Sequence, residues 1–96
     1  MDRIQAMQMF MRVAEAGSFV RAAETLSLPA STVTSTIKNL EKYLKVRLLN
    51  RTTRRVSLTP EGMQYLAQCR EILALIEHSE STLSESVARP QGRLRV

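Results

Sequence analysis

The sequence predicts a mainly α-helical chain, in which three short helices and a two-stranded β-hairpin precede one long helix. Three observations support this prediction. Apolar residues recur at helical spacing before residue 45, alternating residues flank an arginine-rich run at 50–55, and no proline interrupts residues 61–88. A helix-turn-helix followed by such a hairpin is a winged helix-turn-helix, and we expect the long helix to serve dimerisation.

The first helix is expected to begin after Asp2, a good N-cap, and to end at Gly17. The apolar positions at helical spacing are Ile4, Met7, Met11 and Ala14, and the face is widened by Ala6, Phe10 and Val13. This surface is too wide for a single neighbour. We therefore expect part of it to pack within its own domain and part on a second chain.

The second helix is predicted from Phe19 to about Leu26, with Ser18 as its N-cap. Ala22, Ala23 and Leu26 share the inward face. Two adjacent alanines permit close approach of another helix.

The segment 27–29, Ser-Leu-Pro, interrupts the helical pattern because proline disfavours helical geometry before it and donates no amide hydrogen. A third helix follows from about Ala30, with expected buried positions Val33, Ile37, Leu40 and Leu44, and with outward residues Ser31, Thr32, Thr34, Ser35 and Lys38. This arrangement is typical of a helix-turn-helix. An ordinary αα-hairpin has a similar pattern, and this segment alone does not separate the two.

A small β-hairpin is predicted after the third helix, because Val56 and Leu58 alternate with Ser57 and apolar residues precede the run 50–55. The tip is expected to carry Arg51, Arg54 and Arg55. A basic hairpin directly after a helix-turn-helix is a wing. A solvated loop is the alternative that three arginines alone leave open.

The last helix is predicted to open at Thr59-Pro60-Glu61-Gly62, which supplies a capping hydroxyl, a proline at the first helical position and an acid in the first turn. Glycine there costs about 1 kcal/mol relative to alanine. We therefore expect Gly62 to admit a close backbone contact with the hairpin.

Residues at steps of three and four along this helix form a predicted dimerisation seam. They are Leu66, Cys69, Leu73, Ile76, Glu80, Leu83 and Val87. The predicted last helix is roughly 40 Å long at 1.5 Å per residue, and a helix of this length needs another surface to pack against. Further apolar residues in its first half, Met63, Tyr65, Ile72, Ala74 and Leu75, predict that this half contacts both its own head and a partner.

The sign of the net charge changes where the last helix is predicted to begin. Residues 1–58 carry ten Lys and Arg against four Asp and Glu, net +6, whereas residues 59–88 carry one against five, net −4. A basic head on an acidic stalk suits a head that meets phosphate and a stalk that avoids it.

Several classes of protein are excluded by what the sequence lacks. No stretch approaches the roughly 20 apolar residues of a membrane span, and residues 1–12 lack the features of a signal peptide, so we expect a cytoplasmic protein with no membrane partner. Lone Cys69 and lone His78 do not make a metal site. No arrangement of catalytic groups or phosphate-binding glycines predicts an enzyme. Cys69 is expected to pack in the apolar seam rather than to sense redox state.

The expected domains are a winged helix-turn-helix at 1–58, a linker and dimerisation helix at 59–88, and a hinge at 89–96. The hinge ends in an alternating segment, Arg93-Leu94-Arg95-Val96, that begins a strand without a partner. We expect a further domain after Val96.

Several runs of residues together resemble the LysR-type transcriptional regulators of bacteria. They are Ala14-Glu15-Ala16-Gly17-Ser18-Phe19, Arg21-Ala22-Ala23-Glu24, Leu40-Glu41, Leu48-Leu49-Asn50-Arg51, Thr53-Arg54-Arg55-Val56 and Leu58-Thr59-Pro60-Glu61-Gly62. The resemblance implies a homodimer through the long helix, often within a tetramer, on double-stranded DNA. It also implies that a small-molecule effector binds a C-terminal domain absent here, so no cofactor is expected in this segment.

The resemblance further implies that helix 30–44 enters the major groove, and it is at this helix that the sequence departs from the family. Where the family commonly has Ser-Gln-Pro-Ala-Val-Ser-Arg, residues 29–35 are Pro-Ala-Ser-Thr-Val-Thr-Ser, so Ala30 replaces a Gln and Ser35 replaces an Arg that read bases. The candidate DNA contacts are Ser18, Ala30, Ser31, Thr32, Thr34, Ser35 and Lys38, with Arg51 and Arg55 on the backbone and Arg54 in the minor groove. Specificity is therefore expected to lean on DNA shape and the wing.

A protein-interaction module is the main rival function, because winged helices also serve as adaptors. Affinity for duplex DNA at moderate salt separates the two. Single-strand binding is disfavoured, since the four aromatics Phe10, Phe19, Tyr43 and Tyr65 are expected mostly on core faces.

Overall fold

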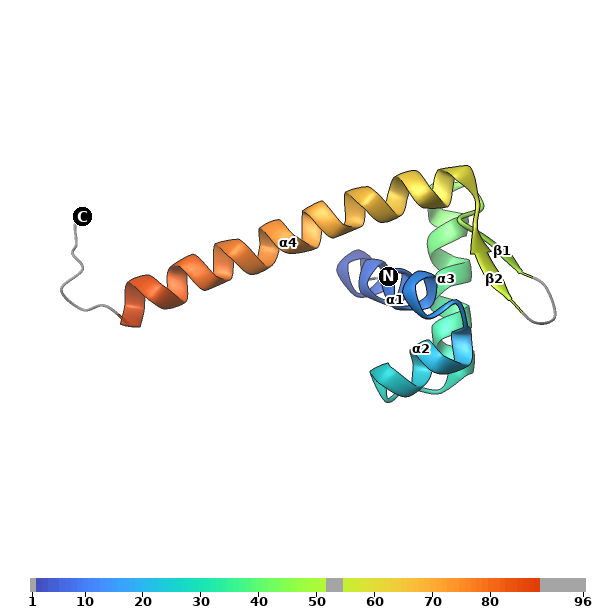
Figure 1. Ribbon diagram of the computed structural model, residues 1–96, viewed down its shortest axis with the longest axis horizontal. Coiled ribbons are helices and arrows are strands. Elements are labelled where there is room, and N and C mark those ends of the chain that lie inside the picture. Colours follow the sequence, from blue (N-terminus) through green and yellow to red (C-terminus); the bar gives the residue numbers. More distant parts are fainter. Residues whose placement is uncertain (1, 52–54, 89–96) are drawn as a thin grey trace.

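The structure, a computed structural model, describes residues 2–51 and 55–88 and consists of a helical head with a hairpin on one side and a long helix leaving the other (Figure 1). Its overall dimensions are 57 × 26 × 21 Å. The elements in order are α1 (Arg3–Ala16), α2 (Phe19–Leu26), α3 (Ala30–Leu44), β1 (Leu49–Arg51), β2 (Val56–Leu58) and α4 (Pro60–Ala88). The predicted winged helix-turn-helix followed by a long helix is confirmed.

Both predicted boundaries of α1 are confirmed. Asp2 Oδ1 accepts a hydrogen bond from the Gln5 amide at 3.1 Å, and Gly17 ends the helix in the left-handed region at φ 67°. That conformation lets the Gly17 amide donate to the Val13 carbonyl.

The turn between α2 and α3 follows the predicted break. Ser27 takes the left-handed conformation, with φ 58°, and the Leu28 amide donates to the Ala23 carbonyl at 3.0 Å. Pro29 then precedes α3 in extended geometry. A turn of three residues, 27–29, thus connects α2 to α3.

One hydrophobic core joins all the elements of the head. Its buried members are Ala6, Met9, Phe10, Val13, Ala22, Ala23, Val33, Ile37, Leu40, Leu48, Leu49, Leu66 and Cys69. On the predicted apolar surface of α1, Ala6, Phe10 and Val13 are buried and Met9 joins them, whereas Ile4 is exposed and Met7, Met11 and Ala14 are half-buried. The apolar surface is therefore wider than the stripe that faces α2, α3 and α4, and the contact of the remaining part with a second chain stays a prediction.

The hairpin is short and antiparallel, with Leu49 opposite Leu58, Asn50 opposite Ser57 and Arg51 opposite Val56. Period-two alternation therefore puts Leu49 and Arg51 on one face of β1, towards the head, and Asn50 on the other.

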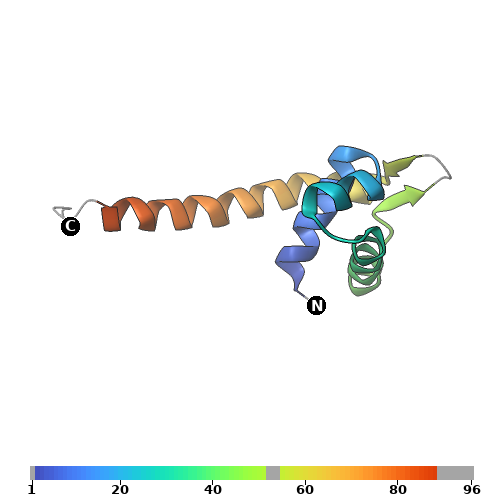
Figure 2. The same ribbon diagram turned by 90° about the horizontal axis from the view of Figure 1, so that it is seen from below.

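Helix α4 is a joint between head and stalk. Its first turns lie against α1 and the hairpin, whereas its far half extends beyond the head (Figures 1 and 2). Leu66 and Cys69 are buried in the head core, which therefore includes residues of both 1–58 and 59–88. Of the helices that the structure describes, none combines the length and apolar character that a bilayer crossing requires.

Candidate nucleic-acid interface

The outer face of α3 presents small polar side chains. Ser31, Thr32, Ser35 and Lys38 are exposed, while Ala30 and Thr34 are half-buried. Val33 and Ile37 are fully buried and hold this face outward. The exposed hydroxyls near the start of the helix and the ammonium one turn later are groups that hydrogen-bond to bases and phosphates.

Ser18 lies at the start of α2, half-buried, and its Oγ accepts a hydrogen bond from the Arg21 amide at 3.2 Å. Its predicted capping role is confirmed. Its predicted DNA contact stays a prediction.

The three predicted wing arginines do not occupy equivalent places. Arg55 is exposed directly before β2, and Arg54 lies outside the described residues. Arg51 is not at the tip: it is the last residue of β1, is half-buried, and points back towards the helices. Arg51 shares a face with buried Leu49, and this two-residue alternation is the reason that the tip assignment was wrong.

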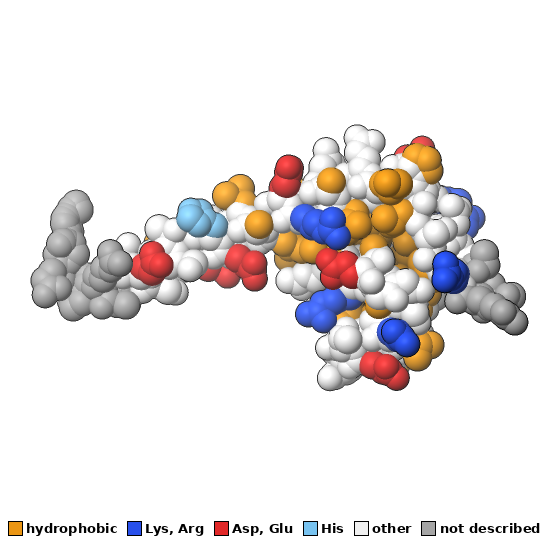
Figure 3. Space-filling view, viewed as in Figure 1, with side chains coloured by type: hydrophobic (Ala, Val, Ile, Leu, Met, Phe, Trp, Pro, Cys, Tyr) orange, Lys and Arg blue, Asp and Glu red, His pale blue; other side chains and the backbone are white. Residues whose placement is uncertain are grey.

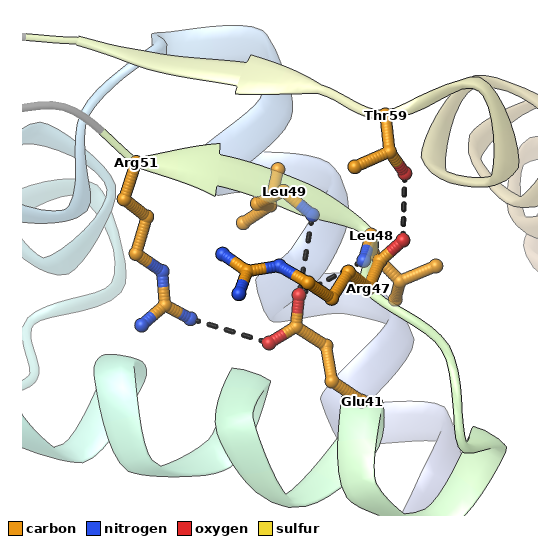
Figure 4. Close-up of polar contacts among 6 residues, drawn as sticks. All are labelled: Glu41, Arg47, Leu48, Leu49, Arg51 and Thr59. Atoms are coloured by element: carbon orange, nitrogen blue, oxygen red, sulfur yellow. Dashed lines mark hydrogen bonds and ion pairs between the residues drawn. The ribbon is translucent and has the colours of Figure 1, made fainter.

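A carboxylate on α3 ties the hairpin to this helix (Figure 4). Glu41 Oε2 accepts hydrogen bonds from the amides of Leu48 and Leu49, at 2.9 and 3.2 Å, and Glu41 Oε1 lies 3.4 Å from Arg51 Nη2. The Arg51 guanidinium carbon also lies 4.9 Å from the centre of the Phe19 ring, at the start of α2. We call Glu41, Arg51 and Phe19 the wing strut.

A second tie joins the base of the hairpin to α4. The Thr59 hydroxyl donates to the Arg47 carbonyl at 2.6 Å and accepts from the Gly62 amide at 2.9 Å, so it caps α4 as predicted (Figure 4). A β-carbon on Gly62 would overlap the carbonyl oxygen of Leu48. The predicted close backbone contact with the hairpin region is therefore confirmed, and it lies at the residue before β1.

Charge is distributed unevenly over the molecule. In Figure 3 the visible Lys and Arg side chains gather towards the head, and the far part of α4 shows acidic side chains and His78. Arg70 pairs with Glu15 of α1 at 3.6 Å, across the joint between stalk and head. Among residues 2–51 and 55–88, no three His, Cys, Asp or Glu side chains are grouped so that they could hold a metal ion.

The predicted dimerisation seam divides into two parts. Leu66, which is 8% exposed, and Cys69, which is fully buried, pack within their own chain, which corrects their assignment to a partner contact. Leu73 and Ile76 are half-buried, Leu83 is exposed, and the side chain of Val87 lies outside the described residues. Steps of three and four identify a helix face but not which neighbour covers it, and here the head covers the first two turns.

Exposed apolar side chains continue along α4 beyond the head. Leu75 is 64% and Leu83 is 68% exposed, and Ile72 is exposed as well. A groove where α1 and the end of α2 meet α4 is lined by Met11, Leu26 and Leu73, together with Gln8, Arg12, Glu15 and Glu77. Nothing within the described chain covers this surface.

Tyr65 and Cys69 complete the packing of α4 on α1. The Phe10 and Tyr65 ring centres are 5.6 Å apart, and burial, followed by the neighbouring Cys69, raises the pKa of Tyr65 to about 12. Burial also raises the pKa of the Cys69 thiol. Cys69 is free, buried and less acidic than usual, so the predicted packing role is confirmed.

Sequence reasoning missed two pairings. Glu41 is one of four acids in a basic head, and no sequence pattern predicts its pairing with the hairpin. Tyr43 is 55% exposed rather than core-facing, and its hydroxyl accepts from Arg3 Nη1 at 3.3 Å.

Comparison with known proteins places this geometry among regulators. Residues 4–63 match the sequence model described as the bacterial regulatory helix-turn-helix protein, lysR family. A transcriptional repressor of the helix-turn-helix type from Pseudomonas aeruginosa is 50% identical over 96 residues, all of this chain and 30% of that protein. The regulator CrgA of Neisseria meningitidis is 45% identical over 92 residues, 96% of this chain and 31% of CrgA. The chain thus spans about three-tenths of the length of these relatives.

Solved structures give the same picture. The DNA-binding domain of BenM in a complex with catB site 1 DNA has a TM-score of 0.85 and 28% identity, covering 88% of this chain and 93% of that one. The DNA-binding domain of CbnR in a DNA complex has a TM-score of 0.83 and 35% identity, covering 90% of this chain and 98% of that one.

Proposed function

This chain belongs to the LysR family of bacterial regulatory helix-turn-helix proteins and is a LysR-type DNA-binding domain, and on that premise we propose that it binds a specific double-stranded operator as a homodimer. Similarity over almost the whole head to domains solved with DNA is the observation that carries the proposal. The basic charge of the head and the polar outer face of α3 agree with it.

In this proposal α3 lies in the major groove. Ser31, Thr32 and Ser35 are exposed near its N-terminus, where the helix dipole favours phosphate and short hydroxyls reach bases only at close range. Lys38, one turn further on, meets a backbone phosphate. Ala30 and Thr34, both half-buried, offer methyl groups to thymine rather than long base-reading side chains.

The wing contacts the adjacent backbone and minor groove through Arg55 and Arg54. Arg55 is exposed directly before β2, and arginine favours a narrow minor groove. Much of the sequence preference then comes from DNA shape, because α3 lacks Gln and Arg on its outer face.

The homodimer forms through α4 of each chain. Leu75, Leu83 and Ile72 are exposed, and an apolar stripe of this kind is covered in a stable assembly. The groove lined by Met11, Leu26 and Leu73 lies beside this stripe and extends the surface available to the partner.

The relatives are about three times as long as this chain, and three further proposals concern a full-length protein of that kind. We propose that a small-molecule effector binds outside residues 1–88, that the full-length assembly can be a tetramer, and that the protein works in the bacterial cytoplasm, where its DNA is. No cofactor is proposed for residues 1–88.

DNA binding is tested by selecting duplexes from a random library with this chain and measuring their affinity against unrelated duplex and single strands. Enrichment of no duplex would contradict the proposal. Within it, Ser35→Arg should tighten binding or change the preferred bases, since guanidinium groups grip guanine in the major groove. An affinity and preference unchanged on every selected duplex would contradict the docking of α3.

Dimerisation is tested by sedimentation of Leu83→Glu, with Ser81→Glu as the matched control on a different side of the same helix. Loss of the burial of Leu83 should weaken self-association by about tenfold or more. The control adds the same charge and should not. A wild-type chain that stays monomeric at high concentration, or a control that dissociates equally, contradicts the proposal.

A further inference from the structure

The wing strut suggests a role in recognition for two residues that need not touch DNA. We propose that Glu41 and Arg51 are positioning residues, which set the wing relative to α3, and that Arg51 acts through Glu41 and Phe19 rather than by contacting phosphate. This inference rests on the proposed DNA binding.

The carboxylate divides its two oxygens between two tasks. Glu41 Oε2 accepts from the amides of Leu48 and Leu49, which lead into and begin β1, and Oε1 faces the guanidinium at the end of that strand. A group on α3 therefore fixes the hairpin at both ends of β1. Charged acceptors make such bonds stronger than neutral ones.

Arg51 is committed inward. Its side chain is 27% exposed and that of Glu41 16%. Its guanidinium lies over the Phe19 ring, and within the described residues its buried Nε has no hydrogen-bond partner. An arginine that left this place to reach a phosphate would give up the ring contact and the ion pair together. The same side chain thereby joins the wing to the first residue of α2.

The sign of the effect separates positioning from simple electrostatics. Glu41 is one of four acids in a head of net charge +6, so removing its charge should by itself tighten binding to polyanionic DNA. Positioning predicts the reverse, because Glu41→Gln places an amide donor opposite either Arg51 or the backbone amides and loosens the wing. Glu24→Gln removes the same charge from an exposed site on α2 for which the described chain shows no ion pair.

The experiment is a double-mutant cycle of Glu41→Gln and Arg51→Met on a labelled duplex selected by the wild-type chain. Affinities are measured between about 50 and 200 mM salt. The logarithm of the affinity falls with the logarithm of the salt concentration, and each lost phosphate contact makes this slope shallower by about 0.9. Hydroxyl-radical footprints of the same complexes report the wing and α3 separately.

We expect each single variant to weaken binding about tenfold, a loss of about 1.4 kcal/mol, with the slope nearly unchanged. The double variant should be little weaker than either single one, since both break one tie. Protection at the wing sites should shift or disappear while that at the α3 sites stays. Glu24→Gln should bind as tightly as wild type or more tightly.

Three outcomes overturn the inference while DNA binding by wild type stands. They are additive losses with a slope reduced by about 0.9 for Arg51→Met, tighter binding by Glu41→Gln, and an unmoved wing footprint. Failure of wild type to bind any duplex would instead overturn the proposed function. Val13→Ala, which thins the core without removing an atom of the strut, controls for stability: it should lower the melting temperature and leave the footprint in place.

Discussion

Replacing Gly62 with alanine tests the joint between head and stalk most directly. A β-carbon there would overlap the Leu48 carbonyl oxygen and lie 2.9 Å from its carbon and 3.2 Å from Leu58 Cδ2. The carbonyl has little freedom to move, because it also accepts from the Thr59 amide at 3.0 Å. Overpacking costs up to about 3 kcal/mol. Alanine regains about 1 kcal/mol of helix propensity. We expect a net loss of about 2 kcal/mol of unfolding free energy.

The assay is thermal unfolding followed by the helical circular dichroism signal, at one protein concentration for all variants because a self-associating chain melts in a concentration-dependent way. A loss of about 2 kcal/mol lowers the melting temperature of a domain of this size by about 8–16 °C.

The matched control makes the opposite exchange on the same helix. Ala67 is exposed on α4, and Ala67→Gly should lower stability by about 1 kcal/mol through helix propensity alone. Alanine is therefore the better residue at 67 and the worse one at 62. A Gly62→Ala chain as stable as wild type, or more stable, would refute the close approach of the two backbones.

Two further predictions concern the same joint. Because burial raises the pKa of Tyr65 to about 12 against 10 in an unfolded chain, its contribution to stability is complete below pH 10 and is lost as pH rises towards 12. Urea midpoints of wild type should therefore fall more steeply over that range than those of Tyr65→Phe, and parallel curves would contradict this. Cys69 is buried with a raised pKa, so it should react with thiol reagents slowly in native buffer and rapidly in urea; rapid native reaction would show the packing to be wrong.

Local chemistry made most of the fold predictable from sequence. Asp2, Ser18 and Thr59 cap their helices because a short oxygen-bearing side chain before a helical run satisfies an otherwise free amide. Gly62 was predictable for a related reason. A glycine in the first turn of a helix lowers helix propensity relative to alanine. Its presence there indicates that a neighbouring group occupies the space that a side chain would need.

The wrong predictions share one cause. The spacing of residues identifies which side chains share a face of a helix or strand, but it does not identify what packs against that face. Leu66 and Cys69 fit the spacing of a seam with a partner chain, but residues of the head cover them. Arg51 was grouped with the tip arginines by charge, although its distance of two residues from Leu49 was a sufficient signal that it faces inward. The pairing of Glu41 with the hairpin joins groups seven to ten residues apart across a turn, and no sequence pattern specifies it.

The burial of Leu66 and Cys69 in the head makes α4 a lever rigidly attached to the head. One residue inserted in the exposed part of the helix, beyond Ile76, would turn everything after it by about 100° and advance it by about 1.5 Å relative to α3. Seven inserted residues would nearly restore the angle and lengthen the lever by about 10 Å. In any assembly held at the far end of α4, the distance and the relative rotation of two heads are therefore set in steps by the length of the helix. Insertions or deletions between Ile76 and Ala88 can change the spacing of two DNA half-sites without altering a residue proposed to face DNA.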